Sequence, residues 1–366
     1  MTTDDFAKPE LRDLVRNFTR REIVPHLADW ERAGAVPRDL HRRAAEVGLL
    51  GIGFPEEVGG EGGDLIDSIV VTEEIIQSGG SSGLIAALFT HGIALPHIVA
   101  GGDRDLIDRF VRPTLRGELI GCLAVTEPDG GSDVAGIRTT ATADGDQYIV
   151  NGTKLFITSG ARADFATTAV RTADGLKLLV VQGFTVTRTL EKMGWHCSDT
   201  AELSFVDVRV PRSHEVGGIH TLLAHFAAER LSLAVQCYAT AQRCLDLTLA
   251  WVRDRHTFGR PLASRQLVRH RLAEMARQVD VARTYVRHAA RRVASGELLV
   301  TEVAMAKNTA VAACDHVVDQ AVQLHGGLGY LRDAEVERHY RDARIMGIGG
   351  GTTEIMNEII AKQLGV

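Results

Sequence analysis

One stretch decides the interpretation of this chain: Leu119-Ile120-Gly121-Cys122-Leu123-Ala124-Val125-Thr126-Glu127-Pro128-Asp129-Gly130-Gly131-Ser132-Asp133. Its apolar first half and its ending in Pro128–Asp133 are typical of a buried strand that stops at a tight turn. Glycine tolerates backbone conformations that other residues avoid, so the turn can expose amide groups beside small hydroxyls. Such groups suit an anionic ligand such as a pyrophosphate. A hairpin loop without a ligand is the alternative, and this stretch alone leaves both interpretations open.

Short strand-like runs follow this stretch as far as residue 211. Three of these runs are Ile137–Ala143, Gln147–Val150 and Thr153–Thr158. They are separated by Asp144-Gly145 and Asn151-Gly152, pairs of residues that favour two-residue hairpin turns. Successive strands joined by tight turns predict an antiparallel sheet or a small barrel. Long helices do not alternate with these strands and no intact Gly-x-Gly-x-x-Gly occurs, so a Rossmann domain is excluded.

Helical patterns lie on both sides of the β region. From Phe6 to about Leu115, apolar residues recur at steps of three and four. After the β region, segments rich in Ala, Leu and Arg predict long helices at His220–Arg253, Leu267–Ser295 and Val303–Leu324, and a last helix starting at Thr353. The expected fold class is α+β. The predicted domains are a helical N-terminal domain (1–118), a middle antiparallel β domain (119–212) and a C-terminal helical bundle (213–366).

Composition and charge exclude several kinds of protein. The net charge of -6 argues against a nucleic-acid-binding protein, which would carry a basic excess. No apolar run approaches the ~20 residues of a membrane-spanning helix, and the acidic N-terminus resembles neither a signal nor a transit peptide. The five cysteines are odd in number and lack a Cys-x-x-Cys spacing, which predicts reduced, buried thiols without a zinc or other metal site. The expected location is cytoplasmic.

Several separated motifs, in this order, make the sequence similar to the acyl-CoA dehydrogenases along essentially the whole chain. The motifs are Val125-Thr126-Glu127-Pro128 with Gly131-Ser132-Asp133, Asn151–Gly160 (NGTKLFITSG), Met193-Gly194-Trp195, Arg255–Arg260 (RHTFGR) and Gln323–Tyr330 (QLHGGLGY). The resemblance implies that family's fold, with a C-terminal four-helix bundle, in a homotetramer that binds FAD.

The same motifs imply which residues bind FAD. Those expected to border the flavin are Leu123, Val125, Thr126, Phe156 and Thr158, with Ser132 near the pyrophosphate. Many relatives have tryptophan at Phe156, so an aromatic side chain is retained. Residues expected to reach FAD in a neighbouring subunit are Arg255, Phe258, Gln323 and Gly327, and those matching positions near the ribose and diphosphate are Thr352 and Glu354. An arginine suits a diphosphate because its planar fork of donors pairs two oxygens at once.

The family's chemistry needs a base for the α proton and a hydrogen bond to the thioester oxygen, because the α C–H is a weak acid. Many members carry the base in Tyr-Glu-Gly-Thr, but this chain has Gly349-Gly350-Gly351-Thr352. Members of the isovaleryl-CoA and long-chain subgroup place it instead where this chain has Glu229. A carboxylate on an apolar helix face is partly desolvated, which raises its pKa. The alternative is an ordinary solvated or salt-bridged glutamate, and the glycine at 350 favours catalysis.

The resemblance also implies substrate contacts and partners. The residues expected to bind the acyl-CoA are Ser132, Phe226, Arg230 and Gly350. The Gly350 N–H is expected to donate a hydrogen bond to the thioester oxygen. The expected product is a trans-2-enoyl-CoA, and the expected electron acceptor is an electron-transferring flavoprotein. An acyl-carrier-protein thioester stays open as the substrate. The alternatives in function are a flavin monooxygenase or oxidase on the same scaffold and a non-catalytic CoA- or flavin-binding protein.

Overall fold

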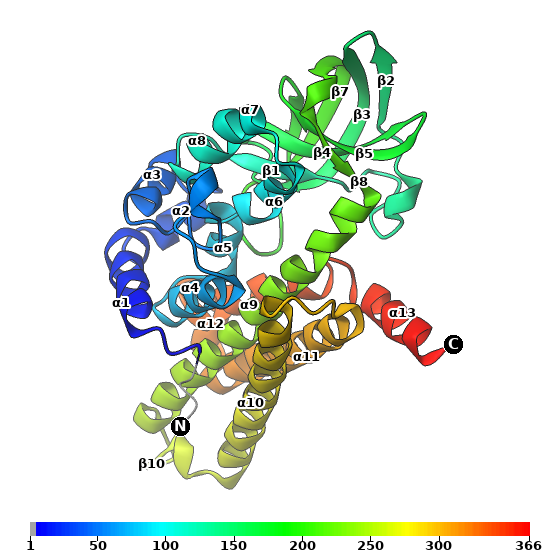
Figure 1. Cartoon of the computed structure of the whole chain (residues 1–366). Coiled ribbons are helices and arrows are strands. Elements are labelled where there is room, and N and C mark those ends of the chain that lie inside the picture. Colours follow the sequence, from blue (N-terminus) through cyan, green and yellow to red (C-terminus); the bar gives the residue numbers. More distant parts are fainter. Residues whose placement is uncertain (1–4) are drawn as a thin grey trace. The chain divides into compact units, whose positions relative to one another are not determined.

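The computed structural model describes residues 5–366, which form two compact units (Figure 1). We call them the helical unit, which comprises the described residues 5–28, 65–82 and 227–366, and the sheet unit, which comprises residues 29–64 and 83–226. These units are defined by contacts within the fold and not by consecutive stretches of sequence. The predicted domain boundaries at 118/119 and 212/213 therefore stay a prediction. The expected order of helices, strands and then helices is confirmed.

The first part of the chain is helical, as predicted. Its helices are α1 (Pro9–Phe18), α2 (Leu27–Ala33), α3 (Arg38–Glu46), α4 (Leu65–Gln77), α5 (Ser82–Leu88), α6 (His91–Gly101), α7 (Arg104–Leu106) and α8 (Arg112–Leu115). The stretch Ser82–Gly101 is the one described segment long and apolar enough to cross a membrane, and 61% of its most apolar 18 residues are buried in the protein. Such burial is typical of a core helix in a globular domain.

The sheet unit contains an eight-stranded mixed sheet. Its strands are β1 (Gly121–Ala124), β2 (Thr140–Asp144), β3 (Gln147–Thr158), β4 (Phe165–Thr172), β5 (Gly175–Val181), β6 (Thr185–Thr189), β7 (Thr200–Pro211) and β8 (Glu215–Gly218). The order is β6-β7-β3-β2-β4-β5-β8, and β1 pairs with β4. Most neighbours are antiparallel, as predicted, but β1 and β2 each pair with β4 in parallel.

Two apolar cores cover the faces of strand β4. Phe165 and Ala169 belong to the core shared with α6, whereas Ala166 and Val170 belong to the core shared with β3 and β7. Because successive side chains of a strand point to opposite faces, β4 is buried on both sides. Strand β4 therefore lies at the centre of the unit, and β1, which belongs to the stretch Leu119–Asp133, pairs with it.

The prediction of two hairpin turns is half confirmed. The chain turns at Asp144–Gln147, the pair that closes the β2–β3 hairpin. The predicted turn at Asn151-Gly152 is wrong, because β3 runs unbroken through both residues and only shifts its register with β7 there. A Cβ atom at Gly152 would lie 2.6 Å from Thr139 Oγ1. The glycine thus permits a close approach of two segments, a common use of glycine within a strand.

The C-terminal part of the chain, most of which belongs to the helical unit, forms three long helices and two shorter ones. These are α9 (Ile219–Asp254), α10 (Gln266–Ala294), α11 (Val300–His325), α12 (Glu335–Ala343) and α13 (Thr353–Leu364), with a small hairpin of β9 (His256–Thr257) and β10 (Arg260–Pro261). All four predicted C-terminal helices are confirmed to within three residues at each predicted end. Helices α10 and α11 run side by side (Figure 1).

One buried carboxylate links four helices of this unit. Glu73 of α4 accepts hydrogen bonds from Arg12 of α1 at 2.5 Å, Tyr238 of α9 at 2.6 Å and Arg287 of α10 at 2.7 Å. A buried carboxylate is stable when its oxygens are paired and hydrogen-bonded in this way. Glu73 thus connects the N-terminal helices of the helical unit with its C-terminal helices.

Candidate active site

The end of β1 lies beside β3 within the sheet unit. The Leu155 N–H donates to Thr126 O at 2.8 Å, and Lys154 Nζ donates to Val125 O at 2.9 Å. The backbone after β1 is therefore bound to the strand that carries Phe156 and Thr158. A Cβ atom at Gly131 would lie 3.4 Å from Thr126 Cγ2, so the following loop also returns to this place.

A buried ion pair fixes this arrangement. Lys154 Nζ lies 2.8 Å from Glu127 Oε1, and Glu127 also accepts hydrogen bonds from the backbone N–H groups of Arg138 and Thr139. Burial alone would raise the pKa of Glu127, but these hydrogen bonds lower it to about 2. Burial lowers the pKa of Lys154 to about 8, against the attraction of Glu127. The pair keeps the loop after β1 in one conformation.

Phe156 presents an aromatic surface next to this backbone. Its side chain is 63% exposed, and its φ is 61°, a conformation that is costly for a bulky residue. The other residues expected to border the flavin are half-buried: Leu123, Val125, Thr126 and Thr158. Ser132 is exposed in the loop after β1. The structure thus joins Val125 and Thr126 to the strand of Phe156 and Thr158. An exposed apolar plane beside hydroxyl groups fits a planar, polar-edged ring system such as a flavin.

The helical unit brings Glu229 of α9 close to Gly350. Glu229 is half-buried, and burial raises its pKa against the opposing charges of Lys307 and Arg230. A Cβ atom at Gly350 would lie 3.5 Å from Glu229 Oε1 and 2.5 Å from Leu233 Cδ1. The carboxylate of the helix therefore lies beside the position from which a side chain at 350 would start.

Two cations hold the residues Gly349–Gly351, which we call the glycine loop. Lys307 Nζ donates to Gly349 O at 2.5 Å and also to Gly351 O, and Arg230 Nε donates to Gly350 O at 3.3 Å. Gly350 has a φ of 63°, in the left-handed region that favours glycine. All three carbonyls of the loop thus accept a hydrogen bond from a positive side chain.

Sequence reasoning missed Lys307 and the pair Glu127–Lys154. Lys307 is only 1% exposed, although it is a lone charge in an Ala-rich segment of α11. A lysine at an apolar helical position is a weak signal of a buried partner, because its long stem often carries the charge back to water. Glu127 and Lys154 lie inside the quoted motifs, which gave no role for either.

A second group of predicted residues is exposed at the far end of α9. The side chain of Trp251 donates to Leu324 O at 3.1 Å, which joins this end of α9 to the end of α11. The guanidinium of Arg255 lies 5.7 Å from the centre of the Trp251 ring. The other exposed residues in the segments that end or follow these helices are Phe258, Gln323 and Gly327. Roughly 25 helical residues separate Glu229 from Arg255, about 38 Å, so the structure does not bring these two side chains together.

The remaining predicted residues have simple surroundings. Thr352 is the N-cap of α13, and its hydroxyl accepts from the Ile355 N–H at 3.3 Å. Glu354 is exposed in the first turn of that helix. Phe226 is half-buried and packs against the apolar core of the sheet unit. Within residues 5–366, no group of three or more His, Cys, Asp or Glu side chains could hold a metal ion.

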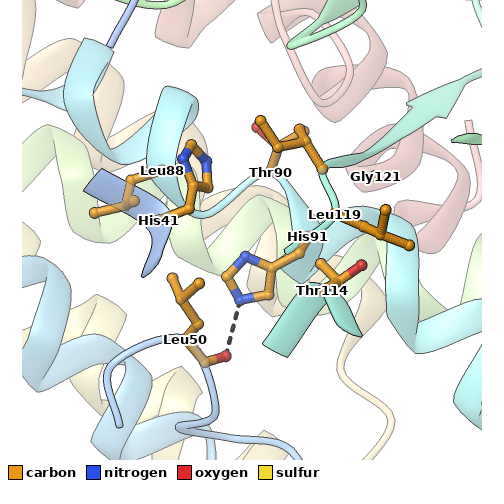
Figure 2. A pocket seen from close by; sticks show the side chains of 9 residues that line it. His41, Leu50, Leu88, Thr90, His91, Thr114, Leu119 and Gly121 are labelled. Carbon is orange, nitrogen blue, oxygen red and sulfur yellow. Dashed lines mark hydrogen bonds between the residues drawn. The ribbon is translucent and has the colours of Figure 1, made fainter. Parts of the chain in front are cut away.

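A small cavity inside the sheet unit carries no part of this site. His41, His91, Thr90 and Thr114 are among the side chains that line it (Figure 2). Burial lowers the pKa of both histidines, to about 3 for His41 and about 4 for His91, so both are neutral. The space suits about one water molecule, not an organic ligand.

Family models match three consecutive parts of the chain. They are described as the acyl-CoA dehydrogenase N-terminal domain (residues 7–118), middle domain (122–208) and C-terminal domain (217–365). The chain belongs to the acyl-CoA dehydrogenase family. The family and fold expected from the motifs are thereby confirmed.

Individual acyl-CoA dehydrogenases are similar over nearly the full length. A probable acyl-CoA dehydrogenase from Mycobacterium abscessus is 62% identical, with a TM-score of 0.97, covering 98% of this chain and 100% of that one. The long-chain specific acyl-CoA dehydrogenase of Sus scrofa is 38% identical over 96% of this chain and 85% of its own length. A glutaryl-CoA dehydrogenase from Mycobacterium smegmatis, solved in complex with FADH2, is 27% identical, with a TM-score of 0.92, covering 99% of this chain and 96% of that one. These matches favour a dehydrogenase over a monooxygenase or a silent binding protein.

Proposed function

We propose that the protein catalyses the FAD-dependent α,β-dehydrogenation of an acyl-CoA thioester, with Glu229 as the base. One observation carries the assignment of the base: a half-buried carboxylate with a raised pKa lies beside Gly350, where the side chain that other members use is missing. A raised pKa makes a carboxylate a better proton acceptor near neutral pH.

The residues of the chain divide the reaction between them. Glu229 removes the α proton of the acyl group, and the electron pair of that C–H bond forms the new double bond as a hydride leaves the β carbon. The Gly350 N–H donates to the thioester oxygen, which gains negative charge in the transition state. Arg230 donates to Gly350 O and is also the residue proposed to bind the CoA moiety of the substrate. FAD, when bound, supplies the acceptor for the hydride.

The residues present fit FAD. Phe156 supplies an exposed aromatic plane, and the hydroxyls of Thr126 and Thr158 lie on backbone segments that are hydrogen-bonded to one another. Ser132 adds a hydroxyl group in the sheet unit. In the helical unit, the residues expected at the cofactor are Thr352, which offers a hydroxyl group, and Glu354, which is exposed in α13.

A second copy of the chain is part of the proposal. Arg255 follows the end of α9, about 38 Å along that helix from Glu229. The other exposed residues expected at the cofactor are Phe258, Gln323 and Gly327, and we propose that all four reach it from a neighbouring subunit. This supports the homotetramer expected from the family. An electron-transferring flavoprotein is the proposed acceptor; a neighbour with a TM-score of 0.93 and 30% identity comes from a structure described as the electron transferring flavoprotein of Acidaminococcus fermentans. A cytoplasmic location is proposed because all five cysteines are free and buried, which suits a reducing compartment.

Reduction of the flavin by substrate tests the function directly. The purified yellow protein is mixed without oxygen with a panel of straight, branched and long acyl-CoAs and with one acyl-carrier-protein thioester. Bleaching of the flavin by an acyl-CoA is the expected result. Bleaching by NAD(P)H alone would support a monooxygenase instead, and an absence of bleaching by every compound would support a silent binding protein.

A further inference from the structure

Lys307 occupies a position that is costly for a charge. Its side chain is 1% exposed in α11, and burial lowers its pKa to about 8. An ammonium group removed from water is stable only when it is paired and hydrogen-bonded. Its ammonium group donates hydrogen bonds to two carbonyls of the glycine loop, and the charge of Glu229 raises its pKa. The buried ammonium group of Lys307 is therefore stabilised mainly by the carbonyls of the glycine loop.

The carbonyl that Lys307 binds belongs to the peptide group that carries the proposed oxyanion donor. Gly349 C=O and Gly350 N–H are the two ends of one planar amide. A hydrogen bond from a cation to the oxygen polarises the amide and strengthens its N–H as a donor. The Gly350 N–H donates to no other described residue, so it is available to a ligand.

The same pattern continues through the loop. Lys307 binds Gly351 O, the oxygen of the amide that carries the Thr352 N–H. Arg230 binds Gly350 O, the oxygen of the amide that carries the Gly351 N–H. The oxygens of three successive amides are thus each bound to a positive side chain before any substrate arrives. Donors fixed in advance stabilise developing negative charge without reorganisation.

We propose that Lys307 is a positioning residue that polarises the Gly349–Gly350 amide and thereby strengthens its hydrogen bond to the substrate's thioester oxygen. This rests on the proposed function. The charge of Lys307 also acts on the other half of the machinery, because it opposes the effect of burial on Glu229 and so favours the ionised base. One ammonium group serves both proton removal and stabilisation of the oxygen.

Lys307→Met removes the charge at nearly unchanged volume, and Lys307→Arg keeps it. Loss of a whole oxyanion donor typically lowers a rate about 10²–10³-fold, so loss of its polarisation should lower kcat by a smaller factor, about 10–100-fold. Lys307→Arg should recover part of that loss. Cys314→Ala, two turns along α11 and also buried, is the control for lost packing and should keep nearly the full rate.

A spectroscopic measurement separates polarisation from loss of packing. Trans-2-enoyl-CoA labelled with ¹³C at the thioester carbonyl is bound to the oxidised holoenzyme, and the carbonyl stretch is read by difference infrared spectroscopy. We expect a shift to lower frequency in the wild type and in Cys314→Ala, a clearly smaller shift in Lys307→Met, and most of the shift in Lys307→Arg. An equal shift in Lys307→Met and wild type overturns the proposal, even if its rate is low.

Two further outcomes keep the test decisive. If Lys307→Met does not fold, the carbonyl shift in the wild type is followed with pH. It should shrink as the pH rises through about 8, where Lys307 loses its proton. Lys307 is faced from α9 by Glu229, Arg230 and Cys237. A shift that stays constant to pH 10 overturns the proposal. A wild type whose flavin no acyl-CoA bleaches refutes the proposed function itself, whereas a bleached wild type with an unchanged Lys307→Met shift refutes only this inference.

Discussion

Replacing Glu229 with glutamine tests the assignment of the base most directly. The amide has the same size as the carboxylate and fits the same half-buried position beside Gly350, but it cannot accept the α proton. Removal of a positioned general base typically lowers a rate about 10²–10⁴-fold, which corresponds to about 3–5 kcal/mol of activation free energy.

The fold should survive this substitution. Because burial raises the pKa of Glu229, its ionised form is less favourable in the folded than in the unfolded protein. A neutral amide removes that cost, so the midpoint of thermal unfolding should not fall. Flavin content, read from the absorbance of the purified protein, should also match the wild type, which separates lost chemistry from lost cofactor.

The assay is anaerobic stopped-flow measurement of flavin bleaching by the best acyl-CoA of the panel. Asp246→Asn is the matched control, since it removes an exposed carboxylate from the same helix α9 and should leave the rate unchanged. A Glu229→Gln variant that bleaches its flavin within about threefold of the wild-type rate would refute the assignment of the base.

Three more results are expected. The bleaching rate should rise with pH over a range above the ordinary glutamate value of 4.5, because the raised pKa of Glu229 delays ionisation of the base, and a pH profile without this limb in the wild type would contradict the role. Phe156→Ala should fold but lose flavin on dialysis, since it removes the exposed aromatic plane; full retention of flavin after the same dialysis would speak against that contact. Glu73→Gln should destabilise the protein by about 3 kcal/mol, because two arginines and Tyr238 lose a shared buried anion, and an unchanged unfolding midpoint in calorimetry would disprove its linking role.

Most of the helices could be predicted because their signals are local. Periodic apolar residues gave the last three long helices and the helix at Thr353 to within three residues at each predicted end. The predicted turn at Asn151-Gly152 was wrong because Gly152 allows a close approach to Thr139, thirteen residues earlier, and no local pattern contains that contact. The parallel pairing of β1 with β4 is equally non-local.

The candidate site was predictable only in part. Family motifs pointed to Glu229 and Gly350, and the structure brings those two residues together. Lys307 could not be found in this way, because a single lysine among alanines looks the same whether it reaches water or a buried carbonyl. Its role depends on the path of the glycine loop, which only the folded chain reveals.

In many other members, one glutamate supplies both the base and the main-chain N–H that binds the thioester oxygen. In this chain the glycine loop separates these two requirements. In the proposed mechanism, position 350 contributes only main-chain atoms to the reaction, while the base, Glu229, belongs to helix α9. A main-chain N–H is present in every residue except proline, so the oxygen-binding half needs no particular side chain at position 350. The constraint on residue 350 is instead its backbone conformation. During divergence, the reach and identity of the base on α9 can therefore change to suit new acyl groups without rebuilding the part that holds the thioester.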